Sequence, residues 1–346
     1  MDLIKSTVFI VIVNYTKYKD TIECLESVLK SSYKNFQIII VDNSPNDKSH
    51  LHITNWLKGG VDTLSTEFPD LVYPLVNKPI NFQQATEGDV ENIIDSDTQI
   101  LLVKAKNRGF AAANNIALKY ILKQNKHDSF TWILNNDTVI EKNCLENLVN
   151  SYKNTTDKFI TASKLRFYFH RNQLQAVAGK YNKWLGSTTH IGEHQTDLGQ
   201  YDNFLFSDDN YIIGASMFLP LIFIKTVGLM EEDYFLYYEE LDWTIRAIGN
   251  GFKCKLQPDA IVYHKEGSSI INNDLSKKKD TSLAEYYSII NRVRFTNRWH
   301  KLCLPTVLTG VLFAIIKRLI KGKFLLVKNI LGGLVNVFTN NTNLAN

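Results

Sequence analysis

The sequence is poor in cysteine and has only a short apolar run near its amino terminus, which argues against two classes of protein. The four cysteines among 346 residues lie far apart without a paired metal-binding spacing, and they are Cys24, Cys144, Cys254 and Cys303. This pattern indicates neither a disulfide framework nor a zinc site, and it fits a reducing compartment. Asp2 and Lys5 precede only six apolar residues, 8–13, and such a run is too short for a secretory signal. We expect it to be the first core strand.

Acidic residues are missing from the carboxyl-terminal end. From Tyr286 to Asn346 there are nine Lys or Arg residues and no Asp or Glu, although the whole chain carries only +4. No uninterrupted apolar run there reaches the roughly 18 to 20 residues that a membrane-spanning helix needs. Because Lys317, Lys321 and Lys328 recur on one helical face, we expect an amphipathic helix, or a pair of them, on an anionic membrane surface. A hydrophobic helix docked on the body or in a dimer is the alternative.

A further helix is expected just before this region, from Leu283 to Trp299. Its apolar positions should face inward, and Arg292, Arg294 and Arg298 should face outward. The sequence contains no stacked aromatic and basic module of the kind that binds nucleic acid.

The most informative stretch is a strand-like run, Phe130–Leu134, that breaks off into three polar residues. These residues are Asn135, Asn136 and Asp137. A buried strand that ends in this way delivers oxygen ligands to the edge of a parallel sheet, where open α/β sheets bind ligands. One carboxylate beside two amides suits Mg²⁺ or Mn²⁺, because these ions accept oxygen donors and share a substrate's phosphates. A strand followed by an Asx turn is the alternative.

Two earlier strands also end in polar side chains. The apolar run at 8–13 is followed by Asn14, and the run at 36–41 is followed by Asp42. The Asp42 carboxylate could accept a hydrogen bond from the imide of a pyrimidine base or from a ribose hydroxyl. A simple turn Asp is the alternative.

A fourth strand, at 100–103, leads to a helix that begins with small residues. The segment after this strand contains Asn107, Arg108, Gly109 and Phe110, with Asn115 further along the helix. Glycine lets the backbone approach a ligand closely, and a helix amino terminus favours phosphate. Tight helix packing would also explain the small residues.

Two long stretches have weak patterns. Residues 45–99 predict an insertion or a long loop over the sheet edge, with a short helix around Leu51–Leu57. Residues 164–209 predict polar loops on an acceptor-side surface. The run Tyr211–Pro220 predicts one core strand with a Gly-Ala-Ser interruption.

Three carboxylates stand within four residues after an aromatic run. They are Glu239, Glu240 and Asp242. Helix capping accounts for one or two of them, and the third favours a general base in a partly apolar cleft. Further on, His264 directly follows the last predicted strand and could reach a metal, although a lone His in such a place is usually structural.

Together these motifs resemble family 2 glycosyltransferases with the GT-A fold, in particular their bacterial rhamnosyltransferase-like branch. The residues that carry the resemblance are Val11–Tyr15, Val41–Ser44, Asn107–Asn115, Leu134–Asp137 and Tyr238–Asp242. The resemblance implies an α/β fold with a Rossmann-like, mostly parallel central sheet flanked by helices and followed by a C-terminal amphipathic helical tail. It divides the chain into a glycosyltransferase domain, 1–270, and a helical region, 280–346. Within the domain, 1–140 would be the nucleotide-sugar half and 141–270 the acceptor half.

The resemblance also assigns roles to single residues. Binding of the nucleotide sugar falls on Asn14, Asp42, Asn107, Arg108, Gly109, Phe110, Asn115, Asn135 and Asn136. Asp137 matches the last carboxylate of the family's Asp-x-Asp metal motif, in which Asn135 replaces the first Asp, and His264 resembles a third metal contact. The family's base, usually an Asp, falls at Glu240, with Asp242 as the alternative. The cofactor implied is Mg²⁺ or Mn²⁺.

The activity implied is inverting transfer of a sugar from a nucleotide-diphospho-sugar to a hydroxyl of a surface-polysaccharide or lipid-linked glycan acceptor. dTDP-rhamnose is the first expected donor, followed by UDP-linked hexoses or galactofuranose. A nucleotidyltransferase that acts on sugar phosphates is one alternative, but it would need a Gly-rich basic loop where Asn14-Tyr15-Thr16 stands. A catalytically silent membrane-docked scaffold is the other. The expected location is cytoplasmic, peripheral on the inner face of the cell membrane, without a nucleic acid partner.

Overall fold

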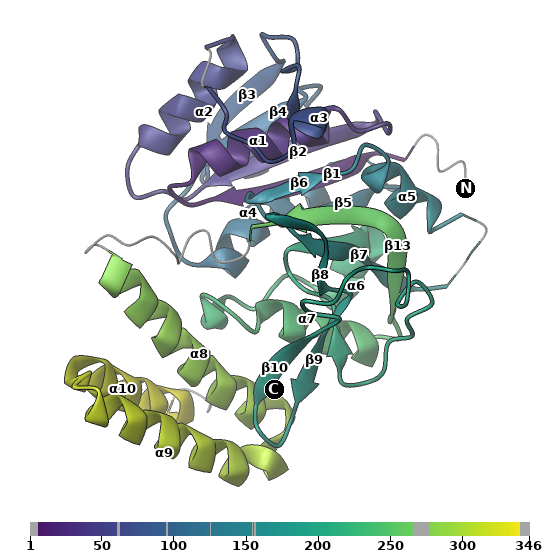
Figure 1. The fold of residues 1–346 in the computed structure, drawn as a ribbon. Helices are drawn as coiled ribbons and strands as arrows, with labels where there is room; N and C mark the ends of the chain where they lie inside the picture. The colour runs from purple at the N-terminus through teal and green to yellow at the C-terminus, as the bar shows by residue number, and fades with distance from the viewer. Residues whose placement is uncertain are drawn as a thin grey trace.

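A ten-stranded mixed sheet forms the centre of the computed structural model (Figure 1). The structure describes residues 6–60, 63–94, 96–124, 126–153, 155, 157–265 and 277–339, so 266–270 and 340–346 of the two predicted regions lie outside the described residues. The strand order is β3-β4-β2-β1-β5-β12-β7-β13-β6, with β8 paired to β7. The strands are β1 (Val8–Asn14), β2 (Phe36–Asp42), β3 (Phe82–Thr86), β4 (Ile100–Lys104), β5 (Phe130–Leu134), β6 (Thr138–Ile140), β7 (Phe159–Phe167), β8 (His170–Ala176), β12 (Ser216–Pro220) and β13 (Lys253–His264).

The amino-terminal half of the sheet is parallel. β3, β4, β2, β1 and β5 all run in the same direction, whereas β12 runs antiparallel to β5 and β7. Strands β1 and β2 are buried almost throughout and mostly apolar because helices cover both faces of the sheet. This confirms the predicted α/β architecture with a mostly parallel sheet.

Two hydrophobic cores lie on opposite faces of the sheet. One face packs against α1 (Tyr18–Leu29), α2 (Lys48–Lys58), α3 (Pro69–Val72) and α5 (Cys144–Asn150). The other packs against α4 (Phe110–Lys123), α6 (Leu221–Val227) and α7 (Glu239–Gly249). Successive side chains of β1 point to opposite faces of the sheet, since Ile10 belongs to the first core and Val11 to the second.

The segment 45–99 is not a long loop. After α2 and α3 it supplies β3, which pairs in parallel with β4 and forms the edge of the sheet. A short turn, Val90–Asn92, then leads back to β4. The weak alternation of β3 explains why its sequence did not predict a strand, because an edge strand is only half buried.

Two predictions for the second half are also wrong. The region 164–209 contains strands rather than loops, since β9 (Ala178–Asn182) and β10 (Ser187–Ile191) form a three-stranded sheet with β11 (Asn210–Tyr211). The single strand expected at Tyr211–Pro220 is two strands in different sheets, β11 and β12. The chain changes sheet at residues 212–215, which include the Gly-Ala pair.

The carboxyl-terminal helices form a layer of their own at the lower edge of the view in Figure 1. α8 (Lys277–Trp299), α9 (Leu304–Ile320) and α10 (Phe324–Thr339) share a separate apolar core that includes Ile290, Val311 and Ile330. The predicted outward orientation of the α8 arginines is wrong for Arg292 and Arg294, which are half-buried, whereas Arg298 is exposed. Arg294 and Arg298 bond to the body of the protein, and Arg292 lines a cavity.

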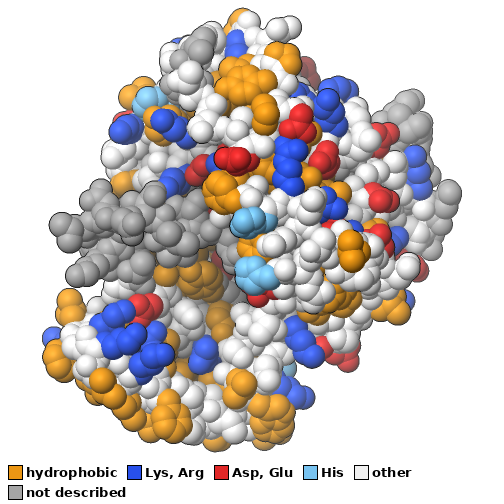
Figure 2. Space-filling model, in the orientation of Figure 1, with side chains coloured by type: hydrophobic (Ala, Val, Ile, Leu, Met, Phe, Trp, Pro, Cys, Tyr) orange, Lys and Arg blue, Asp and Glu red, His pale blue; other side chains and the backbone are white. Residues whose placement is uncertain are grey.

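The outer face of α9 and α10 is apolar. Leu312, Phe313, Leu325, Leu331 and Val335 are all exposed, and hydrophobic side chains gather along this edge of the molecule in Figure 2. Among the described residues, one helical stretch, Lys301–Ile320, is long and apolar enough to cross a membrane by length and composition. The stretch contains Lys317 and Arg318, so it is not the uninterrupted apolar run that the sequence was found to lack.

Candidate active site

Strands β1 and β2 bring Asn14 and Asp42 together, because these final residues are direct partners in the parallel register. The Asn14 amide donates to Asp42 Oδ1 over 2.7 Å, and Ser44 N donates to the same oxygen over 3.2 Å. Lys104, the last residue of β4, approaches Asp42 Oδ2 to 3.3 Å. Both carboxylate oxygens thus have protein partners, and the Asp42 side chain is fully buried.

The segment 107–110 starts α4 with a tight turn. The Asn107 side chain accepts a hydrogen bond from Gly109 N over 3.1 Å, and Gly109 has φ +100°, a conformation that favours glycine. Arg108 points to Glu87, with 3.3 Å between Nη2 and Oε2. Phe110 begins the helix, and its N–H donates to the Phe235 carbonyl over 2.8 Å.

Asn135, Asp137 and His264 meet at the carboxyl end of β5. His264 Nε2 lies 3.1 Å from Asp137 Oδ1 and 3.3 Å from the Asn135 amide. The other ring nitrogen, Nδ1, lies 2.9 Å from Gln175 Oε1. If Nδ1–H donates to Gln175, Nε2 is the acceptor for the Asn135 amide, and a hydrogen bond from the other ring nitrogen is what orients a metal-ligating histidine. Within the described part of the chain, no group of three or more His, Cys, Asp or Glu side chains could hold a metal.

Asn136 connects this cluster to the ends of the parallel strands. Its amide donates to Thr21 Oγ1 over 2.9 Å, and the Thr21 hydroxyl donates to Asn14 Oδ1 over 2.8 Å. Asn136 Nδ2 also lies 3.5 Å from Asn14 Oδ1. Asn14, Asp42, Asn135, Asn136, Asp137 and His264 therefore belong to one contiguous polar region at the sheet edge.

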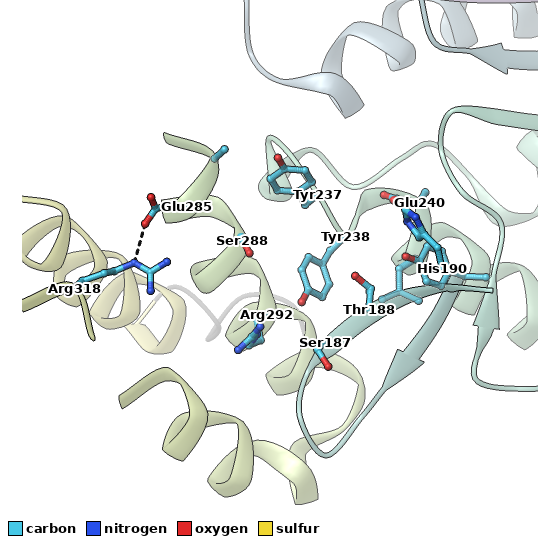
Figure 3. A pocket seen from close by; sticks show the side chains of 13 residues that line it. Ser187, Thr188, His190, Tyr237, Tyr238, Glu240, Glu285, Ser288, Arg292 and Arg318 are labelled. Atoms are coloured by element: carbon cyan, nitrogen blue, oxygen red, sulfur yellow. Dashed lines mark hydrogen bonds and ion pairs between the residues drawn. The ribbon is translucent and has the colours of Figure 1, made fainter. Parts of the chain in front are cut away.

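Glu240 lines a cavity of about 540 Å³ between the small sheet and α8 (Figure 3). β10 contributes Thr188 and His190 to its wall, and α8 contributes Arg292. Tyr238 lies between Glu240 and Arg292 in this view. Burial raises the pKa of the Glu240 carboxyl to about 7, from an ordinary value of 4.5. A carboxyl group with such a pKa can take up a proton near neutral pH.

Gly214 and Ala215 link Glu240 to the end of β5. A Cβ added to Gly214 would lie 3.6 Å from the Glu240 Cβ, so the two residues are in contact. The next residue, Ala215, accepts a hydrogen bond from Asn135 N over 3.0 Å. Residues 212–215, where the chain passes from the small sheet to the large one, thus lie between Glu240 and the Asn135–Asp137 turn.

Asp242 and Asn115 lie away from these groups. The fully buried Asp242 carboxylate accepts a hydrogen bond from Trp299 Nε1 over 2.8 Å and pairs with Arg246 Nε over 2.7 Å. The Asn115 amide exchanges two hydrogen bonds of 2.9 Å with the backbone of Met230. Both side chains are engaged in contacts that hold the 230–242 segment in place.

Three further contributors to the site were not singled out from the sequence. Lys104 directly follows the strand predicted at 100–103, as Asn14 and Asp42 follow theirs. This position could have indicated that Lys104 belongs to the site. Gln175 lies in the region taken for loops, and Arg292 was placed on the outer face of its helix. The first error follows from a strand, β8, that the local pattern did not reveal, and the second from the packing of a helix that the pattern did predict.

Comparison with known proteins agrees with the resemblance drawn from the motifs. The mixed α/β fold has the mostly parallel central sheet and the polar strand ends that the motifs predicted. Residues 9–67, which include most of β1 and all of α1, β2 and α2, match the family model described as Glycosyl transferase family 2, in agreement with the resemblance over this part of the chain. The dTDP-rhamnosyl transferase RfbF of Shigella flexneri is 22% identical over 186 residues, or 52% of this chain and 57% of that protein. The aligned part therefore spans little more than half the length of this relative.

Similar solved structures are more distant. A mannosyltransferase from Pyrobaculum calidifontis, in complex with GDP-Man and Mn²⁺, is 11% identical with a TM-score of 0.48, covering 96% of this chain and 87% of that chain. TarS of S. aureus, in complex with UDP-GlcNAc, is 12% identical with a TM-score of 0.43, covering 88% and 72%.

Proposed function

We propose that the chain is an inverting glycosyltransferase that moves a sugar from a nucleotide-diphospho-sugar to a hydroxyl of a glycan acceptor. The observation that carries this proposal is the position of Glu240. It combines a raised pKa, an adjoining cavity and a connection through Gly214 and Ala215 to the Asn135–Asp137 turn. The family 2 match over residues 9–67 supports the same reaction class.

In this mechanism Glu240 is the general base. Its carboxylate takes the proton of an acceptor hydroxyl in the cavity, and that oxygen attacks the anomeric carbon of the donor sugar. The bond to the nucleoside diphosphate breaks on the opposite face, so the configuration inverts. Asp242 is not assigned this role, because both of its oxygens are bound inside the protein.

The donor would lie along the sheet edge. Asn14, Asp42 and the segment 107–110 would hold the nucleotide, and Asn135 and Asn136 would orient the diphospho-sugar. The structure requires one rearrangement for this, because Lys104 holds the Asp42 carboxylate. A base that binds Asp42 would have to displace Lys104 or share the carboxylate with it.

The residues at the end of β5 would supply some of the ligands of a divalent cation, and the donor would have to supply others. Asp137 and His264 would hold Mn²⁺ or Mg²⁺ together with the donor's diphosphate, and Gln175 would fix the imidazole orientation. When bound, the ion would neutralise charge that develops on the leaving diphosphate. Mn²⁺ suits an imidazole ligand better than Mg²⁺ does.

The donor and acceptor follow from resemblance. dTDP-rhamnose is the first candidate donor, with UDP-linked hexoses or galactofuranose next, and the relative named above is a dTDP-rhamnosyl transferase. A surface-polysaccharide or lipid-linked glycan is the proposed acceptor. The apolar outer face of α9 and α10 and the nearby lysines would hold the enzyme on the inner face of the cell membrane.

A thermal-shift panel of nucleotide sugars, with and without Mn²⁺, tests the proposal. A donor at 100 times its Kd should stabilise the fold by about 2.7 kcal/mol. The same donor should be hydrolysed slowly without an acceptor, and Glu240→Gln should abolish this hydrolysis while leaving the thermal shift in place. A panel in which no nucleotide sugar shifts the unfolding temperature would overturn the proposal.

A further inference from the structure

The backbone just before Glu240 is strained. Phe235, Tyr237 and Tyr238 have φ values of +60°, +69° and +75°. Side chains other than glycine rarely adopt this conformation, and each such residue costs on the order of 1 kcal/mol or more. Three of them within four residues persist only if neighbouring structure holds the segment in place.

Asn291 of α8 supplies this restraint. Its fully buried side-chain amide donates to the Tyr234 carbonyl over 2.6 Å and to the Leu236 carbonyl over 2.7 Å. The Tyr237 carbonyl lies 3.2 Å from the same nitrogen. One amide group thus contacts three carbonyls of the strained segment.

Neighbouring positions on α8 bind the same part of the chain. Arg294 donates to Asn291 Oδ1 over 2.9 Å and also bonds to the Asp233 carbonyl. About two turns after Asn291, Arg298 pairs with Glu231 over 2.6 Å, and Trp299 donates to Asp242. These residues lie on one face of α8, and the segment 231–242 lies against it.

The strained segment also contacts the predicted nucleotide site. The Phe235 carbonyl accepts the hydrogen bond from Phe110 N, and the Phe235 backbone leaves no room for a Cβ on Gly109. The segment therefore joins three elements, namely the start of α4, the start of α7 with Glu240, and α8.

We propose that Asn291 is a positioning residue that sets the placement of Glu240, and that α8 is therefore part of the catalytic unit rather than of the membrane tail. This inference rests on the proposed function, because it takes Glu240 as the base. The reason lies in the geometry of the hydrogen bonds. The amide fixes the carbonyls of residues 234–237, and this fixes the backbone that enters α7 and aims Glu240 into the cavity.

The test compares Asn291→Ala with Asn297→Ala on the full chain. Asn297 lies six residues further along α8 and is half-buried, so it offers a matched control. With the donor identified by the thermal-shift panel, Asn291→Ala should lower the kcat of donor hydrolysis by about 10- to 100-fold. Donor Kd should change less than threefold. The fall of kcat at acidic pH, called the acidic limb of the pH profile, should shift to a different pH because the surroundings of Glu240 change. Asn297→Ala should match the wild type in all three.

Arg294→Gln serves as a milder variant if Asn291→Ala does not fold. It removes the donor that holds Asn291 Oδ1 and the bond to the Asp233 carbonyl but keeps the Asn291 amide, so it should lower kcat by a smaller factor without changing donor Kd. An unchanged kcat and an unchanged acidic limb in a folded Asn291→Ala protein would overturn the inference.

Hydrogen exchange separates this inference from the proposed function. Amides of residues 234–240 should exchange faster in Asn291→Ala than in Asn297→Ala, whatever the substrate is. Unchanged exchange would overturn the inference by itself. If exchange rises but no nucleotide sugar binds the wild type, the proposed function fails, and with it the catalytic role of Asn291, while the restraint on the segment stands.

Discussion

Gly109 lies directly against the backbone of Phe235, so that a Cβ at this position would come within 2.4 Å of the Phe235 carbonyl oxygen. The obstacle is backbone rather than a flexible side chain, and Gly109 also has φ +100°. The start of α4 and the segment that leads to Glu240 can therefore approach each other this closely only with glycine here.

Gly109→Ala should consequently destabilise the protein and disturb both sites. We expect the free energy of unfolding to fall by about 2 kcal/mol, from the strained φ and the displaced backbone. Donor Kd should rise and kcat should fall together. Denaturant unfolding and donor titration measure these effects. Gly310→Ala on α9, where a Cβ meets nothing within 4 Å, is the control and should not reduce stability. Equal stability of the two variants would contradict the close approach.

Glu240 should set the pH dependence of transfer. Its carboxyl pKa is raised to about 7 by burial, and the base works only when deprotonated. The rate should therefore be full above this pH and fall about tenfold per unit below it. Glu240→Gln should lower kcat by about 10²- to 10⁴-fold, and its kcat should no longer fall at acidic pH in this way. The pH profile of kcat is the measurement.

Two neighbouring carboxyls provide controls for this prediction. Glu239→Gln should keep the limb, because burial is the main cause of the raised Glu240 pKa. Asp242→Asn should lower the unfolding temperature, since Arg246 and Trp299 lose a charged partner, but should also keep the limb. A limb that disappears in Asp242→Asn and persists in Glu240→Gln would identify Asp242 as the base.

The sequence predicted those parts of the fold that repeat a local pattern. The largely apolar runs of β1, β2 and β5 and the polar residues that follow them were sufficient, because strand ends of a parallel sheet meet at one edge. The half-buried edge strand β3 has no such pattern, and β11 and β12 look like one strand although the chain changes sheet between them.

The contacts of α8 could not be predicted for a different reason. Arg294 and Arg298 follow Ile290 by four and eight residues, so helical periodicity alone does not separate them from this apolar residue, which packs in the core that α8 shares with α9 and α10. The neighbouring face of α8 is covered by a segment about 60 residues earlier in the chain, whose carbonyls and carboxylates bind the arginines. Such a polar interface is set by tertiary structure and leaves no periodic signal.

Asp137 and Gln175 should both control the affinity for Mn²⁺. With a nucleoside diphosphate present, Asp137→Asn should weaken Mn²⁺ binding at least tenfold, since the only carboxylate in this cluster becomes neutral. Gln175→Ala should weaken it by about 10- to 100-fold, through the loss of the contact that orients His264. The electron paramagnetic resonance signal of free Mn²⁺ measures the binding without turnover. Asp70→Asn, whose carboxylate pairs with Arg171, is the control. Unchanged binding in Asp137→Asn would place the cation elsewhere.

The outer face of α9 and α10 should bind anionic bilayers. Lys317, Lys321 and Lys328 are exposed, and a lysine near such a surface contributes about 1 kcal/mol. Replacing Lys317 and Lys321 by Gln should therefore cost about 2 kcal/mol, or roughly a 30-fold weaker binding to vesicles of phosphatidylglycerol and phosphatidylcholine.

Flotation with these vesicles measures this effect, and the binding should weaken as salt is added. Lys48→Gln with Lys58→Gln, two exposed lysines on α2, is the matched control and should bind like the wild type. Phe313→Ser should weaken binding even to neutral vesicles, because its exposed ring would enter the acyl region. A different outcome is that the protein binds no vesicles, sediments as a dimer, and becomes a monomer in the Phe313→Ser variant. In that case this face binds a second copy of the chain.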